Sequence, residues 1–318
     1  MPFSLFTLRF LMIHIPVLLS EVLHYLDPKP GENFIDATFG FGGHGFAILE
    51  KIGPSGKLLG VELDSEIYQS IQPPKRLILV NDSYANLGEI VKEHNFSSVN
   101  GILFDLGFSS WHIEQSGRGF SFLRDEPLGL NYGLGDDQIT ADQIINQWPE
   151  QEIAKILKDF GEERFAGRIS SFIAAARHQK PINTTFELVE IIRKAIPQRF
   201  QHQKIHPATR TFQALRIAVN DELSNLKKGL AAAMEILSPG GRLVVISFHS
   251  LEDRIVKHFF RQQTEGPESP RGKEIGNLEI LTKKPVCPTD AEIAQNPRSR
   301  SAKLRAARLI SNCSNYSN

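Results

Sequence analysis

The stretch "FIDATFGFGGHG", residues 34–45, holds Gly40, Gly42 and Gly45 at the spacing Gly-x-Gly-x-x-Gly. Between a strand and a helix, glycines at this spacing let backbone N–H groups approach an anionic cofactor group at the helix N-terminus. Apolar residues before the loop predict a strand, and residues 43–51 predict a helix. The pattern indicates a cofactor loop, and it fits either the pyrophosphate of a dinucleotide or the carboxylate of an amino-acid group.

Three acidic residues beside this loop bear on the choice of cofactor. Glu62 ends the next predicted strand, where an acidic residue typically accepts hydrogen bonds from a ribose diol. Asp36, directly before the loop, suits a cofactor with an ammonium and a sulfonium and would repel a pyrophosphate. Asp105 ends the fourth predicted strand and can face a substrate, although such a residue is often only a helix cap. These acids favour S-adenosylmethionine, while a nicotinamide-dependent oxidoreductase stays as an alternative.

The elements that position these residues alternate between strand and helix. Strands are expected at 33–38, 57–63, 76–80 and 99–106, and helices at 43–51, 65–71 and 87–94. Such alternation predicts an α/β fold with a parallel sheet. In open sheets of this kind, ligands bind beyond the carboxyl ends of the strands.

A second pattern replaces the first after the fourth strand. Residues 113–205 show apolar residues at helical spacing, with helices expected at 140–148, 149–160, 162–179 and 184–196. This block is too long for a simple crossover connection. A long helix over 209–237 and a strand over 238–248 then resume the sheet. We therefore expect one α/β domain, 1–112 and 206–318, with an all-helical insertion at 113–205.

The last fifty residues contain two further features. Residues 264–277, rich in Gly, Pro and charged residues, are expected to form a loop. Residues 296–309 carry five basic residues and no acid, and form either an edge strand or a helix.

The composition of the 318-residue chain is that of a globular protein, with 41% hydrophobic and 23% charged residues. The formal net charge is zero, but residues 1–112 carry −5 and residues 206–318 carry +6, so the final third can meet a polyanion. The two cysteines, Cys287 and Cys313, exclude a disulfide framework and fit a reducing cytoplasm. The ten histidines show no metal-ligand spacing, so no metal ligands are assigned, and the sequence leaves a metal requirement open.

No targeting or membrane segment is expected. The apolar N-terminal stretch is interrupted by Arg9 and lacks a signal-peptide cleavage site. No uncharged apolar run reaches the length of about 18 residues that spans a bilayer. The sequence leaves the oligomeric state open.

Long motifs resemble the bacterial ribosomal small-subunit RNA methyltransferase H family. The matching stretches include "HIPVLLSEVL" (14–23), "DATFGFGGH" (36–44), "GILFDLGFSS" (101–110), "RGFSFLRDEPL" (118–128), "GEERFAGRI" (161–169), "IHPATRTFQALRIAVNDEL" (205–223), "PGGRLVVISFHSLEDRIVK" (239–257) and "NPRSRSAKLR" (296–305). The resemblance implies a Rossmann-like class I S-adenosylmethionine-dependent methyltransferase in the cytoplasm. It also implies N4-methylation of a cytosine, cytosine 1402 in the family, in 16S rRNA of the small ribosomal subunit.

The resemblance also implies the residues that hold S-adenosylmethionine. By this resemblance, Gly42, Gly43 and His44 contact the methionine tail, Glu62 contacts the ribose and Tyr84 contacts the adenine. Asp105 and His112 make further contacts with the cofactor. Glu62 stands where the family usually has Asp, and Trp111 and His112 stand where it usually has Pro and Gln.

A larger departure is "PLGLNYG", residues 127–133, where the family usually reads P-L-D-M-R-M-D. Gly129 and Asn131 replace an acid and an arginine. This segment supports an alternative from another class, a ribosome-binding homologue with impaired catalysis.

Candidate catalytic and RNA-binding residues complete the expectations. A cytosine N4 amine is a poor nucleophile, so positioning and a proton acceptor must assist it. The candidate acceptors are Asp105, then Ser109 and His249. The target base must leave its stack, and aromatic residues after the fourth strand, Phe108, Trp111, Phe120 and Phe122, can stack on bases. The candidate phosphate contacts are Arg118, Arg124, Arg298, Arg300, Lys303 and Arg305.

Overall fold

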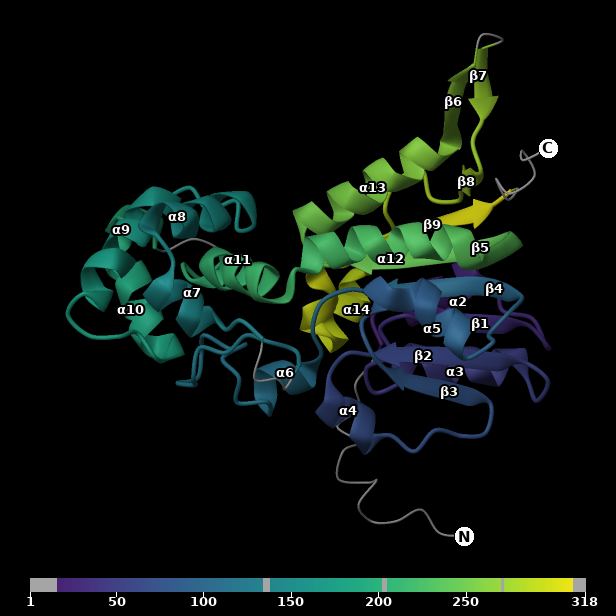
Figure 1. Ribbon diagram of the computed structural model, residues 1–318, viewed down its shortest axis with the longest axis horizontal. Helices are drawn as coiled ribbons and strands as arrows, with labels where there is room; N and C mark the ends of the chain where they lie inside the picture. Colours follow the sequence, from purple (N-terminus) through teal and green to yellow (C-terminus); the bar gives the residue numbers. More distant parts are fainter. Residues whose placement is uncertain (1–15, 134–137, 202–204, 270–271, 311–318) are drawn as a thin grey trace. The chain divides into compact units, whose positions relative to one another are not determined.

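A computed structural model describes residues 16–133, 138–201, 205–269 and 272–310 (Figure 1). The chain forms two compact units. The first combines the chain up to Gly107 with the chain from Asn225 onward, and the second is Phe108–Ser224. The N-terminal apolar stretch and Cys313 lie outside the described residues.

A mixed sheet forms the centre of the first unit. In the described residues its strand order is β3-β2-β1-β4-β5-β9-β8. The first five strands are parallel to one another, β9 is antiparallel to β5, and β8 is antiparallel to β9. The strands are β1 (Asn33–Asp36), β2 (Lys57–Glu62), β3 (Leu77–Asn81), β4 (Val99–Asp105), β5 (Leu237–Ser247), β8 (Leu278–Ile280) and β9 (Lys303–Leu309). The predicted α/β class and its first four strands are confirmed.

Apolar side chains on both faces hold helices against this sheet. On β4, Ile102 and Phe104 face one hydrophobic cluster, while Leu103 between them faces another. The first cluster includes residues of α5, α12 and α13, and the second includes residues of α2 and α3. These helices are α2 (Leu19–Leu26), α3 (Gly43–Ile52), α5 (Leu87–Glu93), α12 (Glu222–Ile236) and α13 (Ser250–Thr264). Shorter helices are α4 (Ser65–Ser70), η1 (Tyr84–Asn86), α14 (Asp290–Gln295) and η3 (Pro297–Ser301).

Two C-terminal expectations are resolved by strand pairing. The expected loop at 264–277 instead contains two antiparallel strands, β6 (Glu265–Ser269) and β7 (Gly272–Ile275), which extend from the end of α13 (Figure 1). The basic C-terminal segment forms strand β9 rather than a helix. It lies between β5 and β8 instead of at the edge, because Leu304, Ala306 and Ala307 bury their side chains in the two clusters.

The second unit is helical around its own hydrophobic core. Its helices are α6 (Ser110–Glu114), α7 (Ala141–Gln147), α8 (Glu150–Asp159), α9 (Ala166–Arg177), α10 (Thr185–Ala195), η2 (Gln198–Phe200) and α11 (Thr209–Asn220). The four predicted helices are confirmed as α7 to α10. Thr184 begins α10 with a capping box in which Glu187 is the reciprocal partner. Buried residues such as Ile153, Ile169 and Leu188 join the helices.

The predicted long helix over 209–237 is two helices. Asp221 adopts a left-handed conformation, φ 47°, and separates α11 from α12. The predicted boundary at 205/206 precedes α11, whereas Phe212 and Leu215 of α11 pack in the core of the second unit. This unit therefore extends further along the chain than the predicted insertion.

Candidate active site

The glycine loop joins β1 to α3 in a backbone geometry that excludes side chains. Gly42 caps α3 with φ 81°, and a Cβ there would lie 2.5 Å from a ring carbon of Phe46. A Cβ on Gly43 would lie 2.6 Å from Cγ of Pro16. A side chain at either position would force Phe46 or Pro16 to move, and the positive φ of Gly42 adds strain, so glycine leaves a bare backbone at the N-terminus of a helix. That surface suits an anionic ligand group such as a carboxylate.

Hydrogen bonds tie this loop to the end of β4. Thr38 donates its N–H to Asp36 Oδ1 at 3.2 Å, and its Oγ1 accepts the N–H of Asp105 at 2.6 Å. His44 is buried in the first turn of α3, with Nε2 2.9 Å from the carbonyl oxygen of Val17. Its Nδ1 lies 3.4 Å from Oδ2 of Asp105. The ends of two neighbouring strands are thereby fixed relative to each other.

Burial makes these carboxyl groups hard to ionise. Asp36 is 1% exposed, and burial raises its pKa to about 7. Burial raises the pKa of Asp105 well above its ordinary value, and the negative charges of Asp36 and Glu252 raise it further. Oδ1 of Asp105 is buried without a hydrogen-bond partner in the described residues. A cation bound beside Asp36 and Asp105 would offset the free-energy cost of burying their negative charges.

Glu62 presents a carboxylate that backbone donors have already oriented. It ends β2 and is buried. Oε2 accepts the N–H of Gly40 at 2.8 Å, and Oε1 accepts the N–H of Asp64 at 2.7 Å. Each oxygen keeps capacity for a further donor, so two hydroxyls can be accepted side by side. Burial raises the pKa of Glu62 to about 7.

Tyr84 lies after β3, in the turn η1 that Ser83 begins by accepting the N–H of Ala85. Its ring meets Phe104 of β4 edge-on at 5.5 Å between centroids. A Cβ on Gly229 of α12 would lie 2.8 Å from the Tyr84 ring, so this glycine makes room for it. The packing gives the aromatic side chain a fixed place in the first unit.

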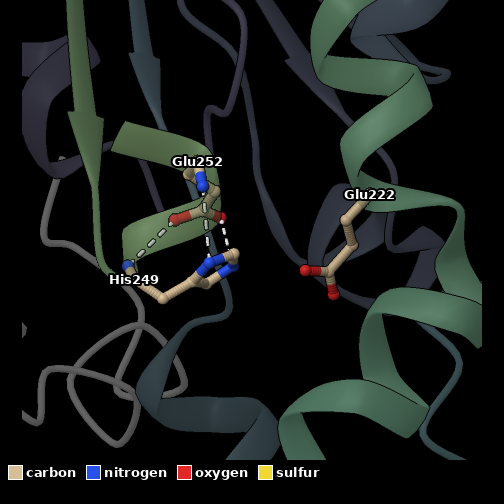
Figure 2. A group of neighbouring side chains, drawn as sticks. All are labelled: Glu222, His249 and Glu252. Atoms are coloured by element: carbon tan, nitrogen blue, oxygen red, sulfur yellow. Dashed lines mark hydrogen bonds and ion pairs between the residues drawn. The ribbon is translucent and has the colours of Figure 1, made fainter. Parts of the chain in front are cut away.

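His249 and Glu252 form a reciprocal cap at the start of α13 (Figure 2). Nδ1 of His249 accepts the N–H of Glu252 at 3.4 Å, and Nε2 lies 3.2 Å from Glu252 Oε1. Glu252 Oε2 accepts the N–H of Phe248 at 2.8 Å. The imidazole thus has a structural role, which weakens its candidacy as a proton acceptor.

Ser109 and His112 are engaged in a similar cap in the second unit. They form the capping box of α6, in which His112 Nδ1 accepts the N–H of Ser109 at 3.2 Å and lies 2.9 Å from its Oγ. The His112 ring is buried and meets Phe120 at 5.0 Å and Tyr132 at 5.3 Å. Ser109 and His112 therefore stabilise the start of α6 through Ser109 Oγ and His112 Nδ1. These are the same atoms that proton transfer or cofactor contact would use.

Phe108 offers a supported aromatic surface. Its side chain is 36% exposed, and the guanidinium carbon of Arg216 lies 4.5 Å from the ring centroid. Arg216 is held by Glu222, with Nε 2.7 Å from Oε1 and Nη2 3.0 Å from Oε2. Because a buried ion pair fixes the cation against the ring, the ring is rigid while remaining accessible.

Two predicted phosphate contacts are internal instead. Arg118 is 8% exposed, donates from Nη1 to the carbonyl oxygen of Tyr132 at 2.7 Å and lies over the Trp111 ring at 5.2 Å. Arg305 is 8% exposed, with Nε 2.7 Å and Nη2 3.3 Å from the two carboxylate oxygens of Asp253. Both guanidinium groups are turned into the protein, where Arg118 donates to a carbonyl oxygen and Arg305 pairs with a carboxylate.

The other predicted contacts stay closer to the surface. Arg298 and Arg300 are exposed on η3. Lys303 is partly exposed, with Nζ 3.5 Å from Asp253 Oδ2. Arg124 is exposed and donates to the carbonyl oxygen of Glu114. These four side chains reach the surface, where phosphate groups can meet them.

The structure adds residues that sequence reasoning did not select. Thr38 connects two strand ends through its hydroxyl and N–H. Glu252 both caps α13 and raises the pKa of Asp105. No local pattern marks the links to Asp105, since that residue is distant in sequence from both Thr38 and Glu252. One overlooked signal is plain in the sequence, because residues 191–220 contain six Lys and Arg and no Asp or Glu.

The parallel sheet, the bare glycine loop and the buried acids at the strand ends define an S-adenosylmethionine-dependent methyltransferase. The sequence profile of the MraW methylase family matches residues 11–310, and the chain belongs to this family. Membership removes the nicotinamide alternative.

Several relatives cover nearly the whole chain. A protein of Geobacter sulfurreducens named ribosomal RNA small subunit methyltransferase H is 46% identical over 310 residues, covering 93% of this chain and 99% of the relative. Proteins of the same name from Heliobacterium modesticaldum and Symbiobacterium thermophilum are 46% and 43% identical, over 93% and 92% of this chain and 98% and 95% of theirs.

Among solved structures, the likeness is weak. An rRNA methylase from Streptococcus thermophilus covers 94% of this chain and 99% of its own, at 10% identity and a TM-score of 0.40. Across the helices in the described ranges, none is both long enough and apolar enough to cross a membrane.

Proposed function

We propose that this protein transfers a methyl group to the N4 amine of a cytosine in 16S rRNA of the small ribosomal subunit, at the position numbered 1402. The family and the names of its relatives support methylation of small-subunit rRNA. The observation that carries the chemistry is Asp105, whose Oδ1 is buried at a strand end with no hydrogen-bond partner in the described residues. A ribosomal substrate puts the reaction in the cytoplasm.

The residues present fit the cofactor group by group. The bare backbone at Gly42 and Gly43 suits the carboxylate of the methionine part, and Asp36 suits its ammonium. Glu62 has two oriented oxygens for the ribose hydroxyls. Tyr84 supplies an aromatic side near the end of β3 for the adenine.

The bound cofactor supplies an electrophilic methyl group on a positively charged sulfur. As the amine nitrogen gains the methyl group, it must release one proton. In its ionised form, which a neighbouring positive charge favours, Asp105 accepts that proton at Oδ1, because this is a buried carboxylate oxygen with no hydrogen-bond partner in the described residues. His44 holds Oδ2 at 3.4 Å and so fixes the orientation of the carboxyl group.

Ser109 and His249 are weaker acceptors in this proposal. Ser109 Oγ is committed to His112, and His249 Nδ1 is committed to the cap of α13, whereas His249 Nε2 lies 3.2 Å from Glu252 Oε1 without a hydrogen-bond partner in the described residues. Substitution of Ser109 or of His249 would remove a helix cap as well as a functional group. We therefore assign them positioning roles.

The RNA side of the proposal uses aromatic and basic groups. Phe108 follows Asp105 by three residues and offers a rigid, accessible ring on which an unstacked cytosine can lie. Trp111, partly buried beside Arg118, is a second aromatic candidate. Arg124, Arg298, Arg300 and Lys303 contact phosphates.

One alternative rests on the divergent segment 127–133, a ribosome-binding homologue with impaired catalysis. The segment is held without the missing charges. Leu130 donates its N–H to the carbonyl oxygen of Arg118 at 2.7 Å, and Tyr132 donates its hydroxyl to Glu222 at 3.1 Å. Asn131 donates to the carbonyl oxygen of Gly133 at 2.7 Å. Asn131 thus holds the segment itself and Tyr132 ties it to Glu222, so neither side chain replaces the charge of the usual arginine.

The test is single-turnover methylation of small ribosomal subunits isolated from cells that lack this protein. We expect transfer of one labelled methyl group per subunit, located by mass spectrometry as N4-methylcytidine. Methylation at another atom or base would overturn the proposed specificity. A protein that binds both S-adenosylmethionine and the subunit but transfers no methyl group would establish the alternative.

A further inference from the structure

The region around α10, η2 and α11 has an unusual charge pattern. Residues 191–220 contain six Lys and Arg and no Asp or Glu, although the whole chain is neutral. Among the described basic residues of this stretch, Arg216 is buried in its ion pair with Glu222. Arg193, Arg199 and Arg210 are exposed. A basic surface therefore forms on the second unit, away from the basic C-terminal segment in the sequence.

An aromatic ring gathers two of the guanidinium groups of this surface. The guanidinium carbon of Arg199 lies 4.9 Å from the centroid of the Phe200 ring, and that of Arg164 lies 5.0 Å from it. Phe165 packs against the same ring at 5.3 Å. Arg164 comes from the turn between α8 and α9, so segments distant in sequence converge on Phe200.

Neither guanidinium has an anionic partner. In the parts of the chain that the structure describes, Arg164 and Arg199 make no ion pair, and both are exposed. Their distances to one centroid keep the two guanidinium carbons within about 10 Å, which is one Debye length in 0.1 M salt. Two like charges this close repel each other, and the ring compensates only in part. An anion between them would remove the repulsion.

Further cations extend the same surface. Arg210 donates from Nη1 to the carbonyl oxygen of Glu162 at 2.7 Å, which places it beside the turn that carries Arg164. Arg193 Nη2 lies 3.4 Å from Nε2 of His206. The only described carboxylates in that turn belong to Glu162 and Glu163. Glu163 is buried, and its Oε1 accepts the N–H of Phe165 at 2.8 Å.

We propose that Arg164 and Arg199, held on Phe200, form a phosphate-binding surface for the rRNA backbone on the second unit. This inference rests on the proposed function, since it names where that substrate is held. Guanidinium groups bind phosphate oxygens in a bidentate manner, which ammonium groups cannot. The surface reads no base, so it contributes affinity and register rather than sequence choice.

The experiment measures binding of 16S rRNA fragments and of small subunits across a salt series, without methyl transfer. In the double variant Arg164→Gln/Arg199→Gln, two lost phosphate contacts should reduce the slope of log affinity against log salt by roughly 1.4–1.8. The matched control is Lys155→Gln/Lys158→Gln, which removes two exposed charges from the same unit. We expect the control to keep the wild-type slope.

A second variant separates the ring from the charges. Phe200→Leu keeps an apolar side chain but removes the aromatic surface, so it should weaken RNA binding several-fold while leaving S-adenosylmethionine binding unchanged. An unchanged salt slope in the folded double variant would overturn the proposal. The methylation assay of the proposed function separates the two proposals. If wild type methylates subunits but the double variant keeps the wild-type salt slope, this surface is wrong and the activity stands. If the double variant changes the slope but wild type does not methylate, the activity is wrong and this surface stands.

Discussion

The two units of this protein treat unpaired charge in opposite ways. In the first, Asp36 and Glu62 are buried at strand ends and the side chain of Asp105 is 19% exposed at another, and none of the three pairs with Lys or Arg in the described residues. In the second, Arg164 and Arg199 are exposed on an aromatic ring without a carboxylate. The signs are opposite, and so is the degree of burial.

This difference teaches which ligand each unit can accept. Buried carboxylates are strongly destabilised unless a cation or hydrogen-bond donors meet them, so they suit a small ligand with fixed charges. Exposed arginines cost little free energy when unoccupied, and they suit a long flexible polyanion. Cofactor binding should therefore depend strongly on pH and weakly on salt, and RNA binding should show the reverse.

The substitution Asp105→Asn tests the unpaired acids of the first unit and should have the largest effect. Loss of the proton acceptor should slow single-turnover methylation by about 10²- to 10⁴-fold. The variant should also melt at a higher temperature than wild type at pH 8 without cofactor. Burial raises the pKa of Asp105 in the folded state above its unfolded value, so ionisation costs stability above the unfolded pKa, and the cost is absent at lower pH.

Calorimetry at pH 8 and pH 4 checks the stability half of this prediction. Asp253→Asn is the matched control, because it removes a paired acid and leaves Arg305 unneutralised. It should lower the melting temperature. If Asp105→Asn methylates at the wild-type rate, another group takes the proton.

A second change tests the aromatic surface at the start of the second unit. Phe108→Ala should reduce methylation of subunits by roughly 5- to 100-fold, because stacking of a base on an aromatic ring is worth about 1–3 kcal/mol. Phe108→Trp should retain most of the rate. The control is Phe186→Ala, which removes another exposed aromatic ring of the same unit. Equal losses in the two alanine variants would show that Phe108 has no special role.

The pH dependence of cofactor affinity examines the buried acids directly. Glu62 and Asp36 have pKa values raised to about 7, and the ionised forms are the ones that accept hydroxyl and ammonium hydrogens. S-adenosylmethionine should therefore bind about tenfold more weakly at pH 6 than at pH 8 if one such group must ionise. Calorimetric titration of wild type and Glu62→Gln measures this.

The glutamine variant should bind more weakly at pH 8 and should lose part of the pH dependence, with Asp36 supplying the remainder. The same titrations in 0.05 M and 0.3 M salt should differ little. A wild-type affinity that does not change between pH 6 and pH 8 would contradict the assignment of these raised pKa values to the cofactor site.

The smallest expected effect concerns the C-terminal basic residues. Arg298→Gln/Arg300→Gln should reduce the salt slope of RNA binding by at most roughly 1.4–1.8, with a modest loss of affinity at low salt. Arg308→Gln is the control, since Arg308 is exposed but already paired with Glu279. Filter binding across a salt series distinguishes them. Identical slopes in all three proteins would leave the arginines of the second unit as the main phosphate contacts.

Local patterns in the sequence were sufficient for much of the fold and for the position of the glycine loop. The strands before Asp36, Glu62 and Asp105 are short apolar runs bounded by turn residues, so their ends are readable without tertiary information. The glycine loop is equally local. Even the break at Asp221 had a signal, because Asn and Asp tolerate the left-handed conformation better than most residues.

What could not be read from the sequence depends on distant partners. Arg305 looked like a phosphate ligand because it stands in a basic run, yet Asp253, 52 residues earlier, neutralises it. Arg118 is buried and donates to a carbonyl oxygen that only the fold of residues 118–132 brings near. A charge count shows how many cations a segment has, but it does not show which of them are already neutralised.

The pairing of β4 with β5 has a consequence for the order in which the protein is made. These neighbouring strands are separated in the chain by the whole second unit. During synthesis, the helical unit emerges complete while the central sheet still lacks β5, β9 and β8. Because that unit has its own core, we expect it to fold first on the translating ribosome, with the cofactor-binding half assembling only after the last strand is released.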